Sequence, residues 1–252
     1  MKVLVTRPAA QAAEWVAQLA AHGIDAAALP LIGIAAPADR AAVEAAWNTL
    51  AGQALVVFVS PNAAEQFFAL RPEGMSWPAD AIAGSPGPGT TSALRARGVP
   101  PGQVVAPAVD APQFDSEALW AQLAGRDWQH ARVTIVRGDG GREWLAETLR
   151  AHGAEVGFVT AYRRTPPDPD ARERALLQQA IRQPGRHLWF FSSSEAIDHL
   201  AALAPDAAWG AARALATHPR IAERARGAGF GAVNECRPTL AAVVACIQSF
   251  DT

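Results

Sequence analysis

The sequence has few of the residues from which several classes of protein are built. Its 252 residues include two cysteines, Cys236 and Cys246, and one tyrosine, Tyr162. The cysteines are too few for a disulfide framework, and neither lies in a CxxC or Cys/His pattern typical of zinc sites. We therefore expect a reducing, cytoplasmic environment and no bound metal.

Charge and long apolar runs are also scarce. Charged residues make up 18% of the chain and the formal net charge is -2, so no general positive field attracts nucleic acid or an anionic membrane. The longest apolar stretch, residues 26–38, contains Pro30 and Pro37 and is shorter than the roughly 20 residues of a membrane helix. A charge and a proline, Arg7 and Pro8, stand where a signal peptide needs apolar residues. We expect a soluble protein without nucleic-acid or membrane partners.

What the sequence does contain is an internal duplication. Residues 2–7 match residues 132–137, and without a gap His22 and Gly23 then fall on His152 and Gly153. Further matching pairs are residues 55–64 with 188–197, 87–94 with 218–225, and the expected helices 116–123 with 239–247. In most of these segments an apolar run leads through a polar turn into helical spacing, which predicts repeated strand-loop-helix units.

These units predict an α/β fold with parallel sheets flanked by helices on both faces. Second strands are expected over residues 25–31 and 155–159. Two proline-bearing stretches, residues 36–39 and 165–170, interrupt the pattern and are the linker candidates. The duplication alone is compatible with two consecutive lobes and with lobes that exchange chain segments.

Polar loops follow the expected strands, at the edge where parallel sheets bind ligands. Their hydroxyls and backbone N–H groups at helix N-termini favour anions. Capping and tight turns are the simpler explanation of any single loop, and the set of loops together suggests anion binding. The loops are residues 6–8, 60–62, 87–92, 137–141, 192–194 and 217–219.

Two residue types in these regions, arginine and tyrosine, are candidates for chemistry. Arg7 and Arg137 directly follow equivalent expected strands, where each guanidinium could bind a carboxylate through two N–H groups or form a surface ion pair. Tyr162 lies just after the expected strand 155–159, and its phenol could donate a proton in an interlobe cleft or pack as a ring at a hinge. His22 and His152 lie at expected helix C-termini, which favours a structural role.

Signatures of other enzyme classes are missing. No Ser/His/Asp or Cys/His set and no acid-base carboxylate pair is recognisable. The glycines at 87–89 do not complete a dinucleotide motif, and those at 138–141 lack the lysine of a phosphate-binding loop. No cofactor is therefore expected.

Taken together, the motifs resemble the uroporphyrinogen-III synthase family over nearly the whole chain. The order and spacing of short motifs carry the resemblance. They are Val3 to Pro8, Phe58 to Ala63, Gly87 to Thr90, Asp115 to Leu119, Arg137-Gly138, Val159 to Arg163 and Phe190 to Ser193.

The resemblance implies two similar α/β lobes joined by a two-strand linker, with the chain leaving the first lobe early and returning to complete it. Lobe one would then comprise residues 1–37 and 168–252, and lobe two residues 38–167. It also implies a monomer.

The implied activity is that of a lyase of tetrapyrrole (heme) biosynthesis. The substrate would be hydroxymethylbilane, a polycarboxylate with an acetate and a propionate on each pyrrole. Its cyclisation to uroporphyrinogen III inverts ring D and loses water, through an azafulvene and a spiro intermediate. Because this chain also closes spontaneously without inversion, orienting it would be the enzyme's main task.

The resemblance also implies roles for individual residues. Tyr162 would assist departure of the hydroxyl. Ser60, Thr90, Ser192 and the loops after Thr6 and Thr217 would contact the substrate. Together with the candidates from the strand-end loops, the expected substrate contacts are Thr6, Arg7, Pro8, Ser60, Asn62, Gly87, Thr90, Arg137, Gly138, Ser192, Ser193 and Thr217. Where relatives often carry Gly-Pro-Thr, this chain has His218-Pro219-Arg220, so Arg220 is expected to supply charge there.

Two other functions are compatible with the residues themselves. A non-catalytic binder of a small acidic metabolite would use the same loops and arginines without needing Tyr162. A nucleotide-dependent enzyme would instead use the glycine-rich loops.

Overall fold

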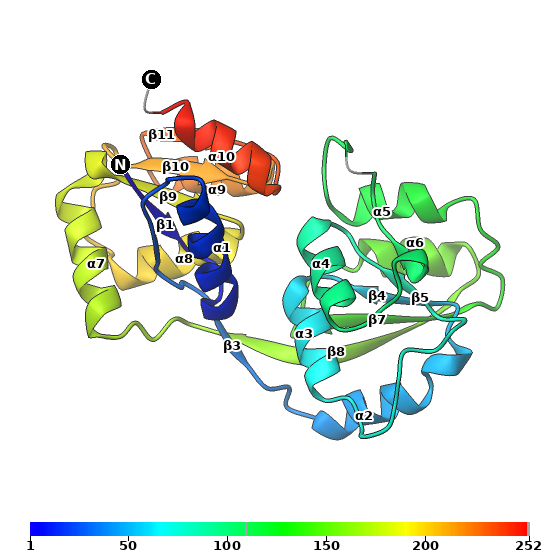
Figure 1. Ribbon diagram of the computed structural model, residues 1–252. Helices are drawn as coiled ribbons and strands as arrows, with labels where there is room; N and C mark the ends of the chain where they lie inside the picture. The colour runs from blue at the N-terminus through cyan, green and yellow to red at the C-terminus, as the bar shows by residue number, and fades with distance from the viewer. Residues whose placement is uncertain (109, 251–252) are drawn as a thin grey trace. The chain divides into compact units, whose positions relative to one another are not determined.

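The computed structural model describes residues 1–108 and 110–250, and these form two compact units (Figure 1). Unit 1 consists of Met1–Gly33 together with the chain from Thr165 onward, and unit 2 consists of Ile34–Arg164. Each unit has its own sheet, built largely from parallel strands. The predicted α/β class is confirmed.

Unit 1 is built on a sheet with the strand order β11-β10-β9-β1-β2, all parallel. The strands are β1 (Lys2–Val5), β2 (Ala26–Ala28), β9 (His187–Phe191), β10 (Arg213–Ala216) and β11 (Ala232–Glu235). The helices are α1 (Ala9–Ala21), α7 (Ala171–Arg182), α8 (Ser194–Leu203), α9 (Pro219–Gly227) and α10 (Leu240–Gln248), with a short 3-10 helix η3 (Pro184–Arg186). The edge strand β2 is shorter than the expected 25–31, and Pro30 has no N–H to donate to the ladder.

Unit 2 is built on a sheet with the strand order β3-β8-β7-β4-β5-β6. The strands are β3 (Gly33–Ala35), β4 (Leu55–Phe58), β5 (Ile82–Gly84), β6 (Val104–Val105), β7 (Arg132–Gly138) and β8 (Glu155–Thr165). The helices are α2 (Arg40–Asn48), α3 (Pro61–Ala69), α4 (Pro88–Ala96), α5 (Ser116–Leu123) and α6 (Trp144–Ala151), with 3-10 helices η1 (Leu50–Gly52) and η2 (Pro101–Gln103). None of the described helices of either unit is long and apolar enough to cross a membrane.

The expected end of strand β8 at Val159 is wrong. The strand continues to Thr165, so Tyr162 lies inside it and not after it. Thr160, Tyr162 and Thr165 are residue types that favour extended structure, and they continue the strand past the apolar run on which the expectation rested. The lobe boundaries expected after Pro37 and Pro167 lie just beyond the ends of β3 and β8, which are neighbours in one sheet.

Strand β4 shows why both faces of the sheet in unit 2 are covered. Its four residues are all buried: Val56 and Phe58 belong to one apolar cluster, and Leu55 and Val57 to another. Because successive side chains of a strand point to opposite faces, both faces must pack against helices. Figure 1 shows such helices on the two faces of each sheet.

The ends of α1 and α6 confirm the correspondence between the duplicated halves. Each helix ends at a histidine, His22 or His152, whose backbone N–H still donates to the last turn. The following residues, Gly23 and Gly153, have φ values of 74° and 94°. Left-handed backbone of this kind favours glycine at a helix end.

We predict that Gly23→Ala and Gly153→Ala each lower the free energy of unfolding by about 1–2 kcal/mol, because an L residue is strained at these φ values. Gly153→Ala must also displace the Gln129 side chain, which would lie 2.5 Å from the new Cβ. Urea unfolding measures both, with Gly157→Ala in β8 as a control that has no neighbour within 4 Å and no such φ. Wild-type stability in both variants would contradict the predicted strain.

Candidate functional site

The loops at the carboxyl edge of the unit 1 sheet collect polar residues from four strands. Because β1, β9, β10 and β11 are parallel, their ends lie at one edge of the sheet. Three of the expected loops are here, at residues 6–8, 192–194 and 217–219. A fourth, residues 236–239 after β11, escaped the sequence analysis because the partly exposed strand Ala-Val-Asn-Glu has no apolar run.

The hydroxyl of Thr6 is committed to the fold. Its Oγ1 donates to the Phe190 carbonyl oxygen at 2.8 Å, and the residue is 1% exposed. The Thr217 backbone N–H donates to the Phe191 carbonyl oxygen at 3.2 Å. These bonds hold the loops after β1 and β10 against β9, so any ligand contact of Thr6 comes from its backbone.

Two helices of unit 1 begin at this edge without a side-chain cap in the described structure. Pro8 precedes α1 and Ser193 precedes α8, and neither side chain accepts a bond from the first turn. In contrast, the His218 Nδ1 accepts the backbone N–H of Arg220 at 3.1 Å at the start of α9. The start of α1 thus presents a helix N-terminus of the type that binds anions, whereas the first turn of α8 already carries the carboxylate of Glu195.

Arg7, at the end of β1, is a cation without an anionic partner among the described residues. Its guanidinium carbon lies 5.0 Å from the centre of the Trp15 ring and 5.9 Å from that of Phe190. Although the residue is partly exposed, its Nε is buried and makes no hydrogen bond within residues 1–108 and 110–250. This burial lowers the pKa of Arg7 to about 10, an effect that the negative charge of Glu14 opposes.

In unit 2 the structure brings together three of the predicted residues, Ser60, Gly138 and Tyr162. The Ser60 Oγ accepts the Ala63 N–H at 3.1 Å, capping α3, and lies 3.1 Å from the Tyr162 hydroxyl oxygen. Gly138 pairs with Tyr162 across β7 and β8 after a register shift at Arg137/Gly138. A Cβ at Gly138 would lie 2.8 Å from the Tyr162 Cζ, so the ring leaves room only for glycine.

The Tyr162 ring is a core residue of unit 2. It is 0% exposed and belongs to the cluster that contains Phe58 and Phe67. Its hydroxyl, however, meets a polar group on each of two elements, Ser60 before α3 and Arg164 in β8. Tyr162 thus combines a ring packed in the core with a hydroxyl held by two polar neighbours.

Arg164 is a residue of this network that the sequence analysis missed. Its Nη2 donates to the Tyr162 hydroxyl oxygen over a long 3.5 Å, and its backbone N–H donates to the Asp139 Oδ1 at 3.0 Å. The adjacent arginines 163 and 164 have the sequence pattern of ordinary surface charge. Only the alternation along β8 beside Tyr162 could have indicated a contact with the phenol.

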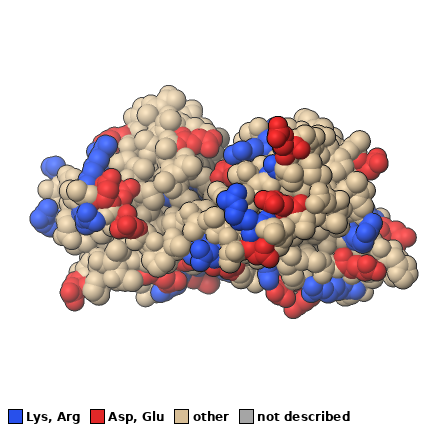
Figure 2. All heavy atoms as spheres, turned by 90° about the horizontal axis from the view of Figure 1, so that it is seen from below, with Lys and Arg blue, Asp and Glu red and all other residues tan. Residues whose placement is uncertain are grey.

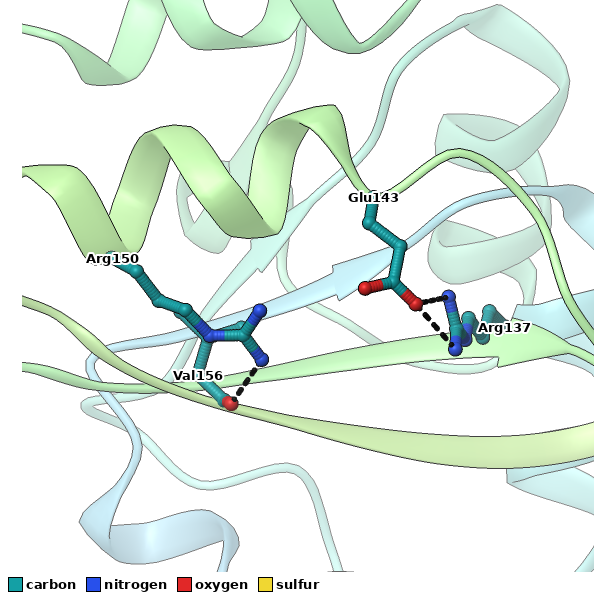
Figure 3. Close-up of polar contacts among 4 residues, drawn as sticks. All are labelled: Arg137, Glu143, Arg150 and Val156. Atoms are coloured by element: carbon teal, nitrogen blue, oxygen red, sulfur yellow. Dashed lines mark hydrogen bonds and ion pairs between the residues drawn. The ribbon is translucent and has the colours of Figure 1, made fainter.

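Arg137 lies inside β7, so the expectation that it follows its strand is wrong. Both of its Nη atoms donate to the Glu143 Oε1 at 3.1 Å (Figure 3). Its guanidinium carbon is 3.8 Å from the centre of the Phe158 ring. The neighbouring Arg150 donates to the Val156 carbonyl oxygen at 3.0 Å. The ion-pair interpretation therefore describes Arg137 in this structure.

The glycine-rich loop before α4 is braced by its own hydroxyls. The Ser85 Oγ donates to the Gly87 carbonyl oxygen at 2.9 Å and lies 2.9 Å from the Thr91 Oγ1. Thr90 is 3% exposed. Gly87 precedes α4 without a side-chain cap, and Asn62 lies in the first turn of α3. This loop offers backbone N–H groups more than free hydroxyls.

The charge distribution leaves ligand recognition to such local groups. Figure 2 shows Lys and Arg interspersed with Asp and Glu over the face that it presents, separated by wide uncharged areas. Among the described residues no cluster of three or more His, Cys, Asp or Glu could hold a metal ion.

Comparisons with known proteins give one consistent result. The family model described as "Uroporphyrinogen-III synthase HemD" matches residues 13–245. The chain is 33% identical over 184 residues to the uroporphyrinogen-III synthase of Salmonella typhimurium, a match that covers 70% of this chain and 70% of the relative. It is 31% identical over 179 residues to that of Proteus mirabilis, covering 70% of this chain and 86% of the relative.

Among solved structures, a mutant uroporphyrinogen III synthase from the extremely thermophilic bacterium Thermus thermophilus is similar with a TM-score of 0.59 and 18% identity. The match covers 100% of this chain and 97% of that chain. At this identity the likeness supports the fold alone.

The single tyrosine makes its contacts directly measurable. Protein labelled with 3-fluorotyrosine should give one ¹⁹F resonance, from residue 162. We predict that Ser60→Ala shifts it, because the hydroxyl loses a partner, and costs about 1 kcal/mol of stability through the lost helix cap. Ser192→Ala, in unit 1, is the matched control and should leave the resonance in place. An unmoved resonance in Ser60→Ala would remove the Ser60 contact.

Proposed function

Because the chain belongs to the uroporphyrinogen-III synthase family, we propose that its strand-end loops bind hydroxymethylbilane and orient it for ring closure. The chain is a lyase that cyclises this substrate to uroporphyrinogen III, with inversion of ring D and loss of water, in tetrapyrrole biosynthesis. The resemblance drawn from the motifs is confirmed. The observation that carries the proposal is the match over residues 13–245, which spans loops of both units.

The substrate's chemistry agrees with the groups at the strand ends. Hydroxymethylbilane is a flexible polyanion, and uncapped helix N-termini bind carboxylates through backbone N–H groups and the helix dipole. Helices α1, α4 and α8 each begin without a side-chain cap in the described structure. Spreading the carboxylates over such fixed donors restricts the chain to one conformation and lowers the entropic barrier to closure.

The proposed contacts are those of the strand-end loops. In unit 1 they are Arg7, Ser192, Ser193, Arg220 and the backbone around Thr6, Pro8 and Thr217. In unit 2 they are Ser60, Asn62, Gly138 and the backbone around Gly87 and Thr90. We place Arg137 outside this set because Glu143 occupies its guanidinium.

Tyr162 is the proposed acid for the first step. The terminal hydroxyl of the substrate takes the phenol proton and leaves as water, while the pyrrole nitrogen supplies the electrons for the new double bond. The pyrrole N–H proton then passes to the phenolate, which gives the neutral azafulvene and restores the phenol. For this step the Tyr162 O–H turns from Ser60 toward the substrate, and the Ser60 O–H can then donate to the phenol oxygen, since these oxygens are 3.1 Å apart. Ring D then attacks to give the spiro intermediate, which fragments and closes again with ring D inverted.

The lobe bounds, the oligomeric state and the location of the protein are part of the same proposal. Residues 1–37 with 168–252 form one lobe and residues 38–167 the other. The protein works as a monomer in the cytoplasm, without nucleic-acid or membrane partners. It uses no cofactor, because orientation of the substrate needs no redox or metal chemistry.

The direct test is to supply freshly generated hydroxymethylbilane and separate the product isomers. Uroporphyrinogen III formed faster than spontaneous closure supports the proposal. Formation of only the uninverted isomer, at the spontaneous rate, would leave a non-catalytic binder of acidic metabolites as the better account.

We predict that Tyr162→Phe lowers kcat at least about tenfold, since general acid catalysis typically contributes about 10²-fold or more. The ring and its packing against Gly138 are retained, so unfolding by urea should change little. Wild-type kcat in a folded Tyr162→Phe would leave Tyr162 with the packing role only.

We predict that Arg220→Ala raises KM more than it lowers kcat, because Arg220 supplies charge to the bound substrate and takes no part in the chemistry. Arg186→Ala is the matched control: Arg186 is also exposed but precedes the amino end of β9. A KM equal to that of the wild type would remove Arg220 from the site.

A further inference from the structure

The two arginines at equivalent positions of the duplicated halves have different surroundings. The Arg137 guanidinium donates twice to the Glu143 carboxylate and lies over the Phe158 ring. Arg7 likewise lies over aromatic rings, those of Trp15 and Phe190. The Nε atoms of both arginines are buried without a hydrogen bond. The difference is that no carboxylate of residues 1–108 or 110–250 forms an ion pair with Arg7.

The sequence explains the difference. In the ungapped match that sets Arg7 on Arg137, the position of Glu143 is taken by Ala13. The carboxylate that influences the charge of Arg7 is that of Glu14. That side chain is exposed on α1 and accepts the Gln18 Nε2 at 3.0 Å. The described part of unit 1 therefore lacks the internal carboxylate that unit 2 provides.

A partly buried guanidinium without an anion is costly for a folded protein. Removal from water disfavours the charged form, and no ion pair within the described residues offsets the loss. The lowered pKa of Arg7, to about 10, has this same cause. The rings of Trp15 and Phe190 cover the guanidinium, a contact that favours a cation and keeps its planar group in place.

The surroundings of Arg7 fit a carboxylate. Arg7 follows β1, and Val5 of β1 is paired with Phe190 of β9. The loop after β9 therefore lies beside Arg7, and it leads into α8, whose N-terminus has no side-chain cap in the described structure. The first turn of α8 carries Glu195, but α1, which begins directly after Pro8, has neither a side-chain cap nor an acidic residue in its first turn. A carboxylate at Arg7 would therefore have a guanidinium and the positive end of the α1 dipole in the same strand-end region.

We propose that Arg7 is the primary anchor for a substrate carboxylate, and that Glu143 takes the place of that carboxylate on Arg137. The proposal rests on the proposed function, because the ligand is the substrate polycarboxylate. Of the two equivalent arginines, Arg137 thus forms an ion pair with Glu143, and Arg7 forms none with the described residues. This asymmetry lets the protein bind one end of a nearly repetitive polyanion in preference to another.

The test compares Arg7→Gln with Arg137→Gln in two measurements, the KM for hydroxymethylbilane and the melting temperature without ligand. Arg7→Gln should raise KM about tenfold or more, as expected for loss of a charge-assisted bond, and leave the melting temperature unchanged or higher. The rise in KM for Arg137→Gln should be severalfold smaller than the rise for Arg7→Gln. Its melting temperature should fall, because the substitution breaks an existing ion pair. Glu14→Gln is the control that should leave KM unchanged.

Arg7→Lys keeps the charge without the two-pronged donor and provides a second variant if Arg7→Gln folds poorly; its KM should also rise. An unchanged KM in both Arg7 variants overturns the inference, as does an equal rise in KM for Arg137→Gln. If the wild type gives only the uninverted isomer, the proposed function and this inference both fail. If the wild type inverts ring D and the Arg7 variants keep the wild-type KM, this inference alone is wrong.

Discussion

Parallel pairing of strands is the constraint on which the remaining structure depends. A parallel strand cannot be joined to its neighbour by a tight hairpin, so the chain returns through a helix each time. The ends of β1, β9 and β10 are therefore collected at one edge of their sheet, followed by the starts of α1, α8 and α9. Backbone donors and helix dipoles accumulate there without any catalytic motif, and this is the physical basis on which we propose that the loops bind a polyanion.

The corresponding edge in unit 2 is organised around one tyrosine. The register shift at Gly138 brings Tyr162 opposite a residue with no side chain, and the ring fills the space that a Cβ would occupy. The same ring is in the apolar core, while its hydroxyl lies 3.1 Å from the Ser60 oxygen that caps α3. Packing thus fixes the position of a polar group at the end of β4.

The fold could be predicted further than the site. Apolar runs, helical spacing and the glycines at 23 and 153 predicted the α/β class and several element ends, since these depend on local backbone preferences. Strand β8 was predicted too short because its later residues include Thr160, Arg163 and Arg164 and are not a continuous apolar run. The partners of Arg7 and Arg137 were not predicted, because the sequence shows Ala13 in the place of Glu143 but not that the Glu143 side chain contacts the Arg137 guanidinium.

The same limit applies to the hydroxyls. Thr6 and Ser60 both follow apolar strands and both precede helices, yet the Thr6 hydroxyl donates to the Phe190 carbonyl oxygen whereas Ser60 faces Tyr162. A hydroxyl can bond to the backbone or face another side chain. Which of the two it does depends on residues that are more than one hundred positions away in sequence. Short motifs indicate the family, and three-dimensional contacts decide the role of each side chain.

A crystal structure of the protein with uroporphyrinogen III bound would test most directly the claim that the strand-end loops hold the polycarboxylate. We expect carboxylates at the Arg7 guanidinium and at the starts of α4 and α8, with Arg137 still paired to Glu143. A product bound away from these loops, or seated on Arg137 with Arg7 unoccupied, would contradict it.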